Sequence, residues 1–121
     1  MAAEPEFDWS QAASLLGDDP QDVPEEMAEI VRELVETTAL RLEELKNKNF
    51  ETDRKAIGGL AHQLRGSLLN FGFTGVGTVL FRIEKTEYTL EEYHAMLAET
   101  EVLFTDSVKI LAQRYPTLRI S

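Results

Sequence analysis

His62 is the residue whose type and surroundings point most directly to chemistry in this sequence of 121 residues. The apolar residues around it recur at helical spacing, and at about 100° per residue they place the imidazole opposite the apolar face, in solvent. Gly59 and Gly66 stand about one turn away on either side, although a glycine inside a helix costs up to about 1 kcal/mol relative to alanine. An imidazole without bulky neighbours is open to a large partner, so the pattern indicates chemistry on a ring nitrogen.

Other residues of the same segment support a docking site around this histidine. Arg65 lies one turn from His62 and can reach a negative group attached to the ring. Gly58 widens the clearing, and Leu69 is an apolar residue on the outward face, where we expect it to be exposed and to contact a partner. The alternative is an ordinary surface histidine, with Gly58 and Gly59 marking a break at which the helix begins.

The composition argues against most other kinds of reactive site. The sequence has no cysteine, which excludes disulfides, thiolate metal sites and cysteine nucleophiles. A second histidine, His94, is far from the first in the sequence and has no obvious carboxylate partner, which argues against a metal site. Residues 72–77 resemble a phosphate loop but lack the preceding strand and the Lys-Ser/Thr ending, so we expect a turn between helices. We therefore expect no enzyme active site, and no metal or cofactor of the protein's own.

The distribution of charge indicates the kind of partner. The chain has 12 basic and 22 acidic residues and a formal net charge of −10, so the basic face that a nucleic-acid binder needs is missing. Residues 54–83 hold no carboxylate, and residues 53–86 carry five basic and two acidic side chains, a net of +3. We expect this segment to face an acidic partner, unless burial alone explains the missing carboxylates.

Length and hydropathy favour one water-soluble domain over residues 1–121. No apolar run approaches about 18 residues, which argues against a membrane span. Residues 1–7 lack the basic start and apolar stretch of a secretory signal. We therefore expect a cytoplasmic protein, without membrane or nucleic-acid partners, that acts as a monomer.

Apolar spacing predicts helices over nearly the whole chain. A short helix is expected over about 8–16, and four longer amphipathic helices are expected over about 22–48, 52–71, 74–86 and 89–115. No stretch alternates apolar and polar residues for long enough to form a strand. Four amphipathic helices with short connections predict an all-α fold, an antiparallel four-helix bundle over about 22–115 with a short extra N-terminal helix.

A few residues predict the helix ends and faces. Asp22, with a glutamate three residues later, has the pattern of a helix start, and Thr89 with Glu92 forms a capping box. Pro116 is expected to end the last helix. Ile30 is placed on the apolar face of the first long helix by its spacing from the neighbouring aliphatic residues.

Residues 61–72 resemble the signature of histidine-containing phosphotransfer (HPt) domains in two-component phosphorelays, and the predicted four-helix bundle matches the fold of that family. After its histidine that signature has an apolar residue at the second position, lysine at the third, glycine at the fourth, small residues at the fifth and sixth, and glycine at the tenth. Four positions match, namely Leu64, Gly66, Ser67 and Gly72. Two positions depart from it, because Arg65 replaces lysine and Leu68 replaces a small residue.

The resemblance implies that Nε2 of His62 takes a phosphoryl group from an aspartyl phosphate of a receiver domain, or from a kinase, and passes it to another receiver. It implies that Arg65 counters the phosphoryl charge and that Glu84 holds the other ring nitrogen. Mg²⁺ would come from the acidic pocket of the receiver. Two alternatives stay open: an HPt-like adaptor that binds receiver or kinase domains without carrying phosphate, and a fragment of a larger hybrid kinase.

Overall fold

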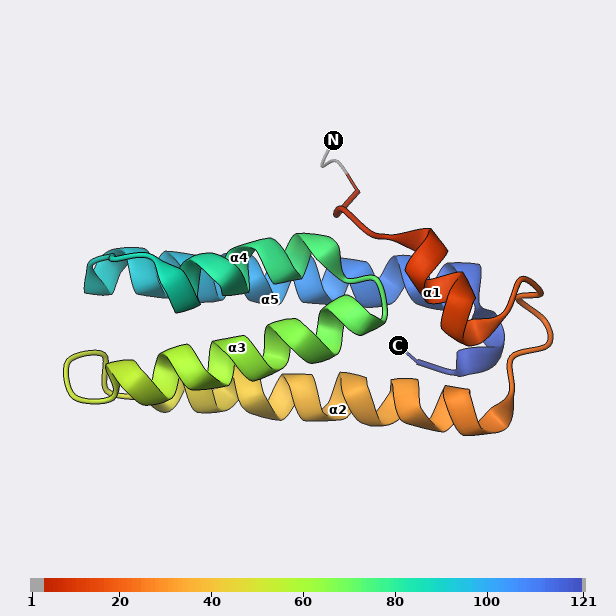
Figure 1. The fold of residues 1–121 in the computed structure, drawn as a ribbon, viewed down its shortest axis with the longest axis horizontal. Coiled ribbons are helices and arrows are strands. Elements are labelled where there is room, and N and C mark those ends of the chain that lie inside the picture. Colours follow the sequence, from red (N-terminus) through yellow and green to blue (C-terminus); the bar gives the residue numbers. More distant parts are fainter. Residues whose placement is uncertain (1–3, 121) are drawn as a thin grey trace.

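A computed structural model describes residues 4–120, and within this range the chain is helical without a single strand (Figure 1). The all-α prediction is confirmed. Residues 1–3 and 121 of the predicted domain lie outside the described residues. The helices are α1 (Trp9–Leu16), α2 (Glu25–Asn47), α3 (Arg54–Asn70), α4 (Thr74–Lys85), α5 (Leu90–Arg114) and the 3₁₀ turn η1 (Pro116–Leu118).

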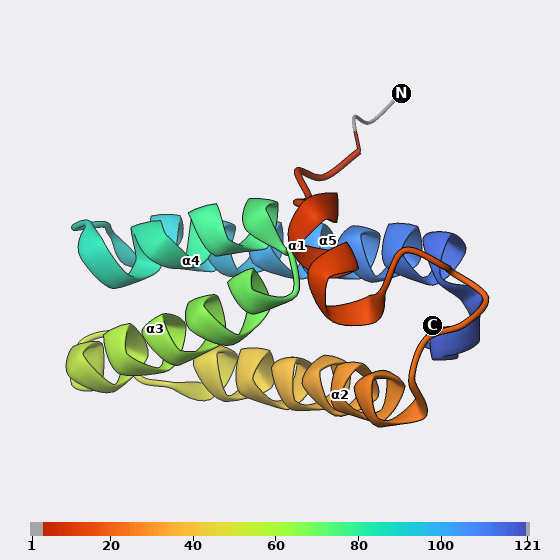
Figure 2. The same cartoon turned by 45° about the vertical axis from the view of Figure 1, so that its right-hand side comes forward.

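The four longer helices, α2 to α5, run alternately in opposite directions and lie alongside one another (Figures 1 and 2). The α3–α4 pair makes the most extensive contact, and α5 packs on both α4 and α2. The short helix α1 crosses the bundle near the α3–α4 turn, where Gln11 Nε2 donates to the Asn70 carbonyl at 3.0 Å. This is the predicted antiparallel bundle with an extra N-terminal helix. In the described part of the chain, no helix combines the length and apolar character that a membrane span requires.

Each long helix buries one face in a shared apolar core, as its spacing predicts. On α3 the buried side chains are Ile57, Ala61, Leu64 and Leu68. On α2 one predicted core residue is wrong, because Ile30 is 45% exposed while Ala28 is buried. Ile30 lies about 100° around the helix from Val31, which is buried, and so falls outside the stripe that faces the core.

Two of the three predicted helix ends are confirmed. The capping box at α5 is confirmed, with Glu92 N–H donating to Thr89 Oγ1 at 3.1 Å and Thr89 N–H donating to Glu92 Oε1 at 2.9 Å. The last α-helix ends at Arg114, just before Pro116, as predicted. The predicted start at Asp22 is wrong, since α2 begins at Glu25 with Pro24 as its N-cap and no side-chain cap. The Pro24 carbonyl accepts from the N–H groups of Met27 and Ala28, both at 3.0 Å, so the first turn starts at Pro24 and Asp22 lies two residues upstream of the N-cap.

The N-terminal segment holds the connection between α3 and α4. The N–H of Asp8 donates to the Gly72 carbonyl at 2.8 Å, and the N–H of Gly75 donates to the Glu6 carbonyl at 3.0 Å. Gly72 has a φ of +96°, and a Cβ there would lie 2.5 Å from the Asp8 carbonyl oxygen. The predicted helix–helix turn is therefore present but short, with Gly75 already inside α4.

Candidate functional site

His62 stands in the middle of an uninterrupted helix. Because α3 runs from Arg54 to Asn70, the alternative of a break at Gly58 and Gly59 is wrong. The neighbouring Ala61 and Leu64 are buried, which turns the imidazole away from the core and leaves its side chain 63% exposed. The ring is therefore accessible to a macromolecule on the outward face of α3.

Glu84, near the end of α4, meets the inner edge of this ring. His62 Nδ1 lies 3.1 Å from Glu84 Oε1 and 3.0 Å from Oε2. The Glu84 side chain is only 10% exposed, whereas the ring it contacts is mostly in solvent. The pairing of His62 with Glu84 that the family resemblance implies is therefore present as a contact between α3 and α4.

A glycine on α4 permits this close approach of the two helices. Gly77 is buried, and a Cβ at that position would lie 2.7 Å from Leu69 Cδ2 and 3.8 Å from Arg65 Cγ. A larger residue would force either the Leu69 side chain or α4 to shift at this point. The contact also makes Leu69 half-buried, so its predicted exposure on the outward face is wrong.

Arg65 lies on the α4 side of the histidine and bonds to the same carboxylate. Its Nη2 donates to Glu84 Oε1 at 3.1 Å, and its guanidinium carbon is 5.0 Å from the centre of the Phe81 ring. The Nε atom is buried and, among the described residues, has no hydrogen-bond partner. The side chain is 23% exposed, so the guanidinium is partly open to solvent beside the histidine.

Lys85 completes the group, and its pairing with Glu84 is one of the ordinary surface contacts that the sequence leaves open for that carboxylate. Its Nζ lies 3.1 Å from Glu84 Oε2, the oxygen that is also 3.0 Å from His62 Nδ1. The only sequence signal for it is its position next to Glu84, and adjacent residues on a helix rarely share a face. The place of Lys85 in this group is therefore seen in the structure and not in the spacing of the sequence.

The cations keep Glu84 ionised. Burial tends to raise the pKa of Glu84, but hydrogen bonds from Lys85, His62 and Arg65 outweigh it and hold that pKa below its usual value. An ionised carboxylate only accepts hydrogen bonds, so the ring must donate the Nδ1 proton to it. In the neutral imidazole this leaves Nε2 with a free lone pair.

The three glycines around His62 differ in their surroundings. A Cβ added at Gly59 or Gly66 would have no other atom within 4 Å, so both leave open space beside the ring. Gly58 is half-buried instead, and a Cβ there would lie 4.0 Å from the Glu84 carbonyl oxygen. Gly58 therefore faces α4, and the clearing predicted around the histidine consists of Gly59 and Gly66.

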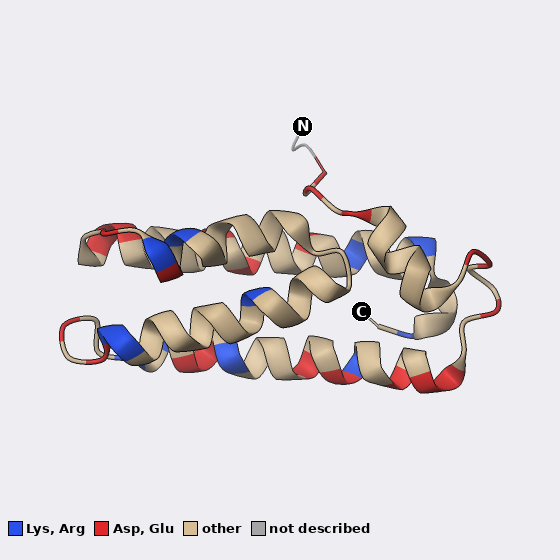
Figure 3. Ribbon diagram, in the orientation of Figure 1, with Lys and Arg blue, Asp and Glu red and all other residues tan. Residues whose placement is uncertain are grey.

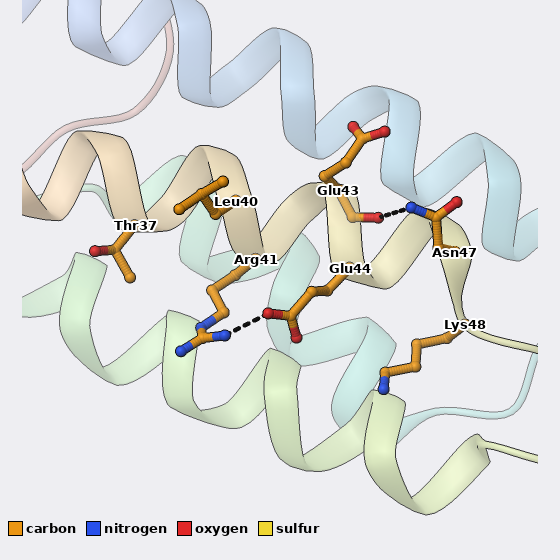
Figure 4. Close-up of a pocket in the computed structure, with 7 residues that line it drawn as sticks. All are labelled: Thr37, Leu40, Arg41, Glu43, Glu44, Asn47 and Lys48. Carbon is orange, nitrogen blue, oxygen red and sulfur yellow. Dashed lines mark hydrogen bonds and ion pairs between the residues drawn. The ribbon is translucent and has the colours of Figure 1, made fainter.

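Other candidate positions lie apart from this group. His94 is exposed on α5, and Leu68, which departs from the family signature, is fully buried in the core. Within residues 4–120 no three His, Asp or Glu side chains lie close enough together to hold a metal ion. An open hollow of about 490 Å³ lies along α2, where Arg41 pairs with Glu44 and Asn47 bonds to the Glu43 carbonyl (Figure 4). None of the residues around His62 lines this hollow.

The charge pattern separates α3 from its neighbour. Acidic residues recur along α2, while α3 has basic residues and no acidic one (Figure 3). The one carboxylate at the site, Glu84, is paired with Arg65 and Lys85. The outward face around His62 therefore presents no free negative charge in an acidic protein.

Comparison with known families agrees with this geometry, because the sequence matches the Hpt domain model over residues 21–113. The chain belongs to the Hpt domain family. Hpt domains are helical phosphocarrier modules of two-component signalling, and they interact with response-regulator receivers and kinases. The matched range contains α2, α3 and α4 and all but the end of α5, whereas α1 lies outside it. No curated protein and no solved structure was found to match the sequence.

Proposed function

We propose that this Hpt domain is a phosphorelay intermediate that carries a phosphoryl group on Nε2 of His62. It receives the group from an aspartyl phosphate on a receiver domain, or from a hybrid histidine kinase, and gives it to the aspartate of a response-regulator receiver. One observation carries the proposal: an exposed ring has its Nδ1 3.0 and 3.1 Å from a nearly buried carboxylate, which leaves Nε2 facing outward.

The transfer step needs no proton to leave the ring. The Nε2 lone pair attacks the phosphorus, the P–N bond forms, and the P–O bond to the donor aspartate breaks with its electron pair on the carboxylate. Nδ1 keeps its proton, so the phosphorylated ring is an imidazolium. Glu84, held ionised beside Nδ1, stabilises that positive charge. In the second transfer a receiver aspartate attacks the phosphorus and the P–N electron pair returns to Nε2.

The surrounding residues supply charge and access. Arg65 supplies positive charge for the phosphoryl oxygens, although in the unphosphorylated protein its Nη2 bonds to Glu84. Gly59 and Gly66 let the loops of a receiver close over the ring. Mg²⁺ for the reaction belongs to the acidic pocket of the receiver, and the domain acts as a cytoplasmic monomer.

Labelling from a receiver tests the proposal. A receiver domain charged with radiolabelled acetyl phosphate should transfer label to the wild-type protein, and the label should be labile in acid and stable in base. His62→Gln should take up no label while its melting temperature stays nearly unchanged, because an exposed side chain contributes little to stability. His94→Gln, which changes the other exposed histidine, is the matched control and should label normally. Label on the His62 variant would contradict the assignment.

The contacts of the Arg65 guanidinium favour a second function. Because its guanidinium bonds to Glu84 and stacks on Phe81, the site resembles one in which the cation is structural. The chain would then be an adaptor that binds receiver or kinase domains without carrying phosphate. Binding to a receiver measured by calorimetry, together with a failure of the wild type to take up label, would favour the adaptor.

A further inference from the structure

We infer that Lys85 is a positioning residue of this site, which together with Arg65 clamps the Glu84 carboxylate so that both of its oxygens face the His62 ring. Where it concerns the rate of phosphoryl transfer, the inference rests on the proposed function. The clamp itself is a property of the unphosphorylated protein.

The Glu84 carboxylate is contacted by one cation at each of its two oxygens. Arg65 Nη2 donates to Oε1 at 3.1 Å, and Lys85 Nζ forms an ion pair with Oε2 at 3.1 Å. The ring nitrogen of His62 lies almost equally far from the two oxygens, at 3.1 and 3.0 Å. A carboxylate held at one oxygen can rotate about its terminal torsion, which is broad. Two cations on opposite oxygens restrict that rotation and orient the ring through its Nδ1 proton.

The second cation also changes the charge balance of the site. Glu84 contributes one negative charge, while Arg65 and Lys85 contribute two positive ones, so the surroundings of a neutral ring have one positive charge in excess. A phosphoryl group brings about two negative charges. Without Lys85 the site would be neutral before transfer and less favourable for the incoming dianion.

Lys85 is placed to act through Glu84 rather than as part of the fold. Its side chain is 55% exposed, so it packs little and its removal should leave the bundle intact. Arg82, one turn earlier on α4, is the matched residue, because it is also an exposed cation but pairs with Glu99 on α5 at 2.7 Å. The two residues have similar charge and exposure and differ in the carboxylate they contact.

The first experiment measures the ring in the unphosphorylated protein. In ¹⁵N-resolved NMR spectra of the neutral ring, wild-type His62 should be protonated on Nδ1. Lys85→Met should raise the population of the other tautomer several-fold, and Lys85→Arg should restore most of the wild-type ratio. Arg82→Gln should leave the ratio unchanged. Wild-type spectra for Lys85→Met, or an equal change in Arg82→Gln, would overturn the clamp.

The second experiment measures transfer from a labelled receiver. Lys85→Met should slow labelling on the order of threefold to tenfold, the size expected for one charge at a partly exposed site, and Lys85→Arg should recover at least half of the loss. Arg82→Gln should stay within about twofold of wild type. Normal labelling of Lys85→Met would overturn the proposed effect of the Lys85 charge on the transfer rate. If the wild type itself takes no label, the proposed function fails, while the tautomer measurement still decides the clamp.

Discussion

At the scale of single residues, the chemistry depends on how one carboxylate is shared. Glu84 accepts from a histidine, an arginine and a lysine, although its side chain is 10% exposed. Such a carboxylate is ionised at neutral pH, and its charge is matched by cations on both sides. His62 gains a fixed hydrogen-bond partner at Nδ1 while Nε2 stays in solvent. In the proposed function, the nitrogen that carries the phosphoryl group is therefore selected by the hydrogen-bond partner on the opposite edge of the ring.

Removing this carboxylate should affect transfer more than stability. Glu84→Ala should slow receiver-dependent labelling about tenfold or more, because partners that orient a reactive imidazole are typically worth that much. Glu84→Gln keeps an oxygen that accepts from Nδ1 but loses the charge, so its rate should fall between wild type and Glu84→Ala. Labelling time courses would check this order. Equal rates for all three proteins would show that Glu84 has no part in the site.

The lowered pKa of Glu84 also predicts a dependence of stability on pH. A carboxyl group whose pKa is lower in the folded than in the unfolded state stabilises the fold above its ordinary pKa, and this stabilisation disappears as the pH falls through the folded value. The melting temperature of wild type should therefore exceed that of Glu84→Gln near pH 7, and the difference should shrink toward pH 3. A constant difference across this range would contradict the ionic contribution.

At the scale of elements, two glycines make the α3–α4 pair possible. Gly77 lets α4 approach the Leu69 side chain, and Gly72 lets the N-terminal segment cross the turn. The ring of Phe7 packs on Phe73, with centroids 5.1 Å apart, so the segment covers an apolar end of the bundle. Together these contacts hold α4 against α3, and Glu84 meets His62 as a consequence.

Gly72→Ala should weaken this end of the bundle. The added Cβ would lie 2.5 Å from the Asp8 carbonyl oxygen, and the φ of +96° is strained for any residue with a side chain. We expect a loss of about 1–3 kcal/mol in the free energy of unfolding, measured by urea denaturation. The control is Gly66→Ala, which adds a Cβ to open space and should stabilise α3 by up to about 1 kcal/mol. If Gly72→Ala unfolds at the wild-type urea concentration, the N-terminal segment moves aside at no cost.

At the scale of the whole molecule, charge is distributed unevenly over the surface. The chain carries a net charge of −10, yet α3 has no acidic residue. Lys55, Gly59, His62 and Gly66 follow one another along the outward line of α3, and all four are exposed. α5 packs on α2 and α4, so its exposed residues belong to a different side of the bundle. An acidic partner is therefore attracted to one side of a protein that repels it elsewhere.

A pair of charge reversals distinguishes local from total charge. Lys55→Glu and Lys109→Glu change the net charge equally, but Lys55 lies on the outward face of α3 and Lys109 is exposed on α5. With a receiver domain as partner, Lys55→Glu should weaken binding on the order of threefold to tenfold at low salt, whereas Lys109→Glu should change it less than twofold. Titration calorimetry at two salt concentrations would measure both. Equal losses would mean that only the total charge matters.

The sequence by itself determined the helices and the face on which His62 lies. Predicted ranges of 52–71 and 74–86 compare with Arg54–Asn70 and Thr74–Lys85, because apolar spacing reports helix phase and phase is a local property. The same phase put His62 in solvent and Leu64 in the core. The capping pattern misplaced the start of α2 at Asp22, since Pro24 is the N-cap instead.

The family resemblance implied that Glu84 meets the ring, but only the tertiary structure decided how α4 packs on α3 and which cations join that carboxylate. Spacing along α4 does not give the height or rotation at which it packs on α3, and these depend on Gly77, which no periodicity distinguishes from a turn glycine. That packing buried Leu69, turned Gly58 toward α4 and brought Lys85 to the oxygen of Glu84 that also faces His62. Helix phase is encoded by neighbours in the chain, whereas the offset between two helices is set by how their side chains fit together.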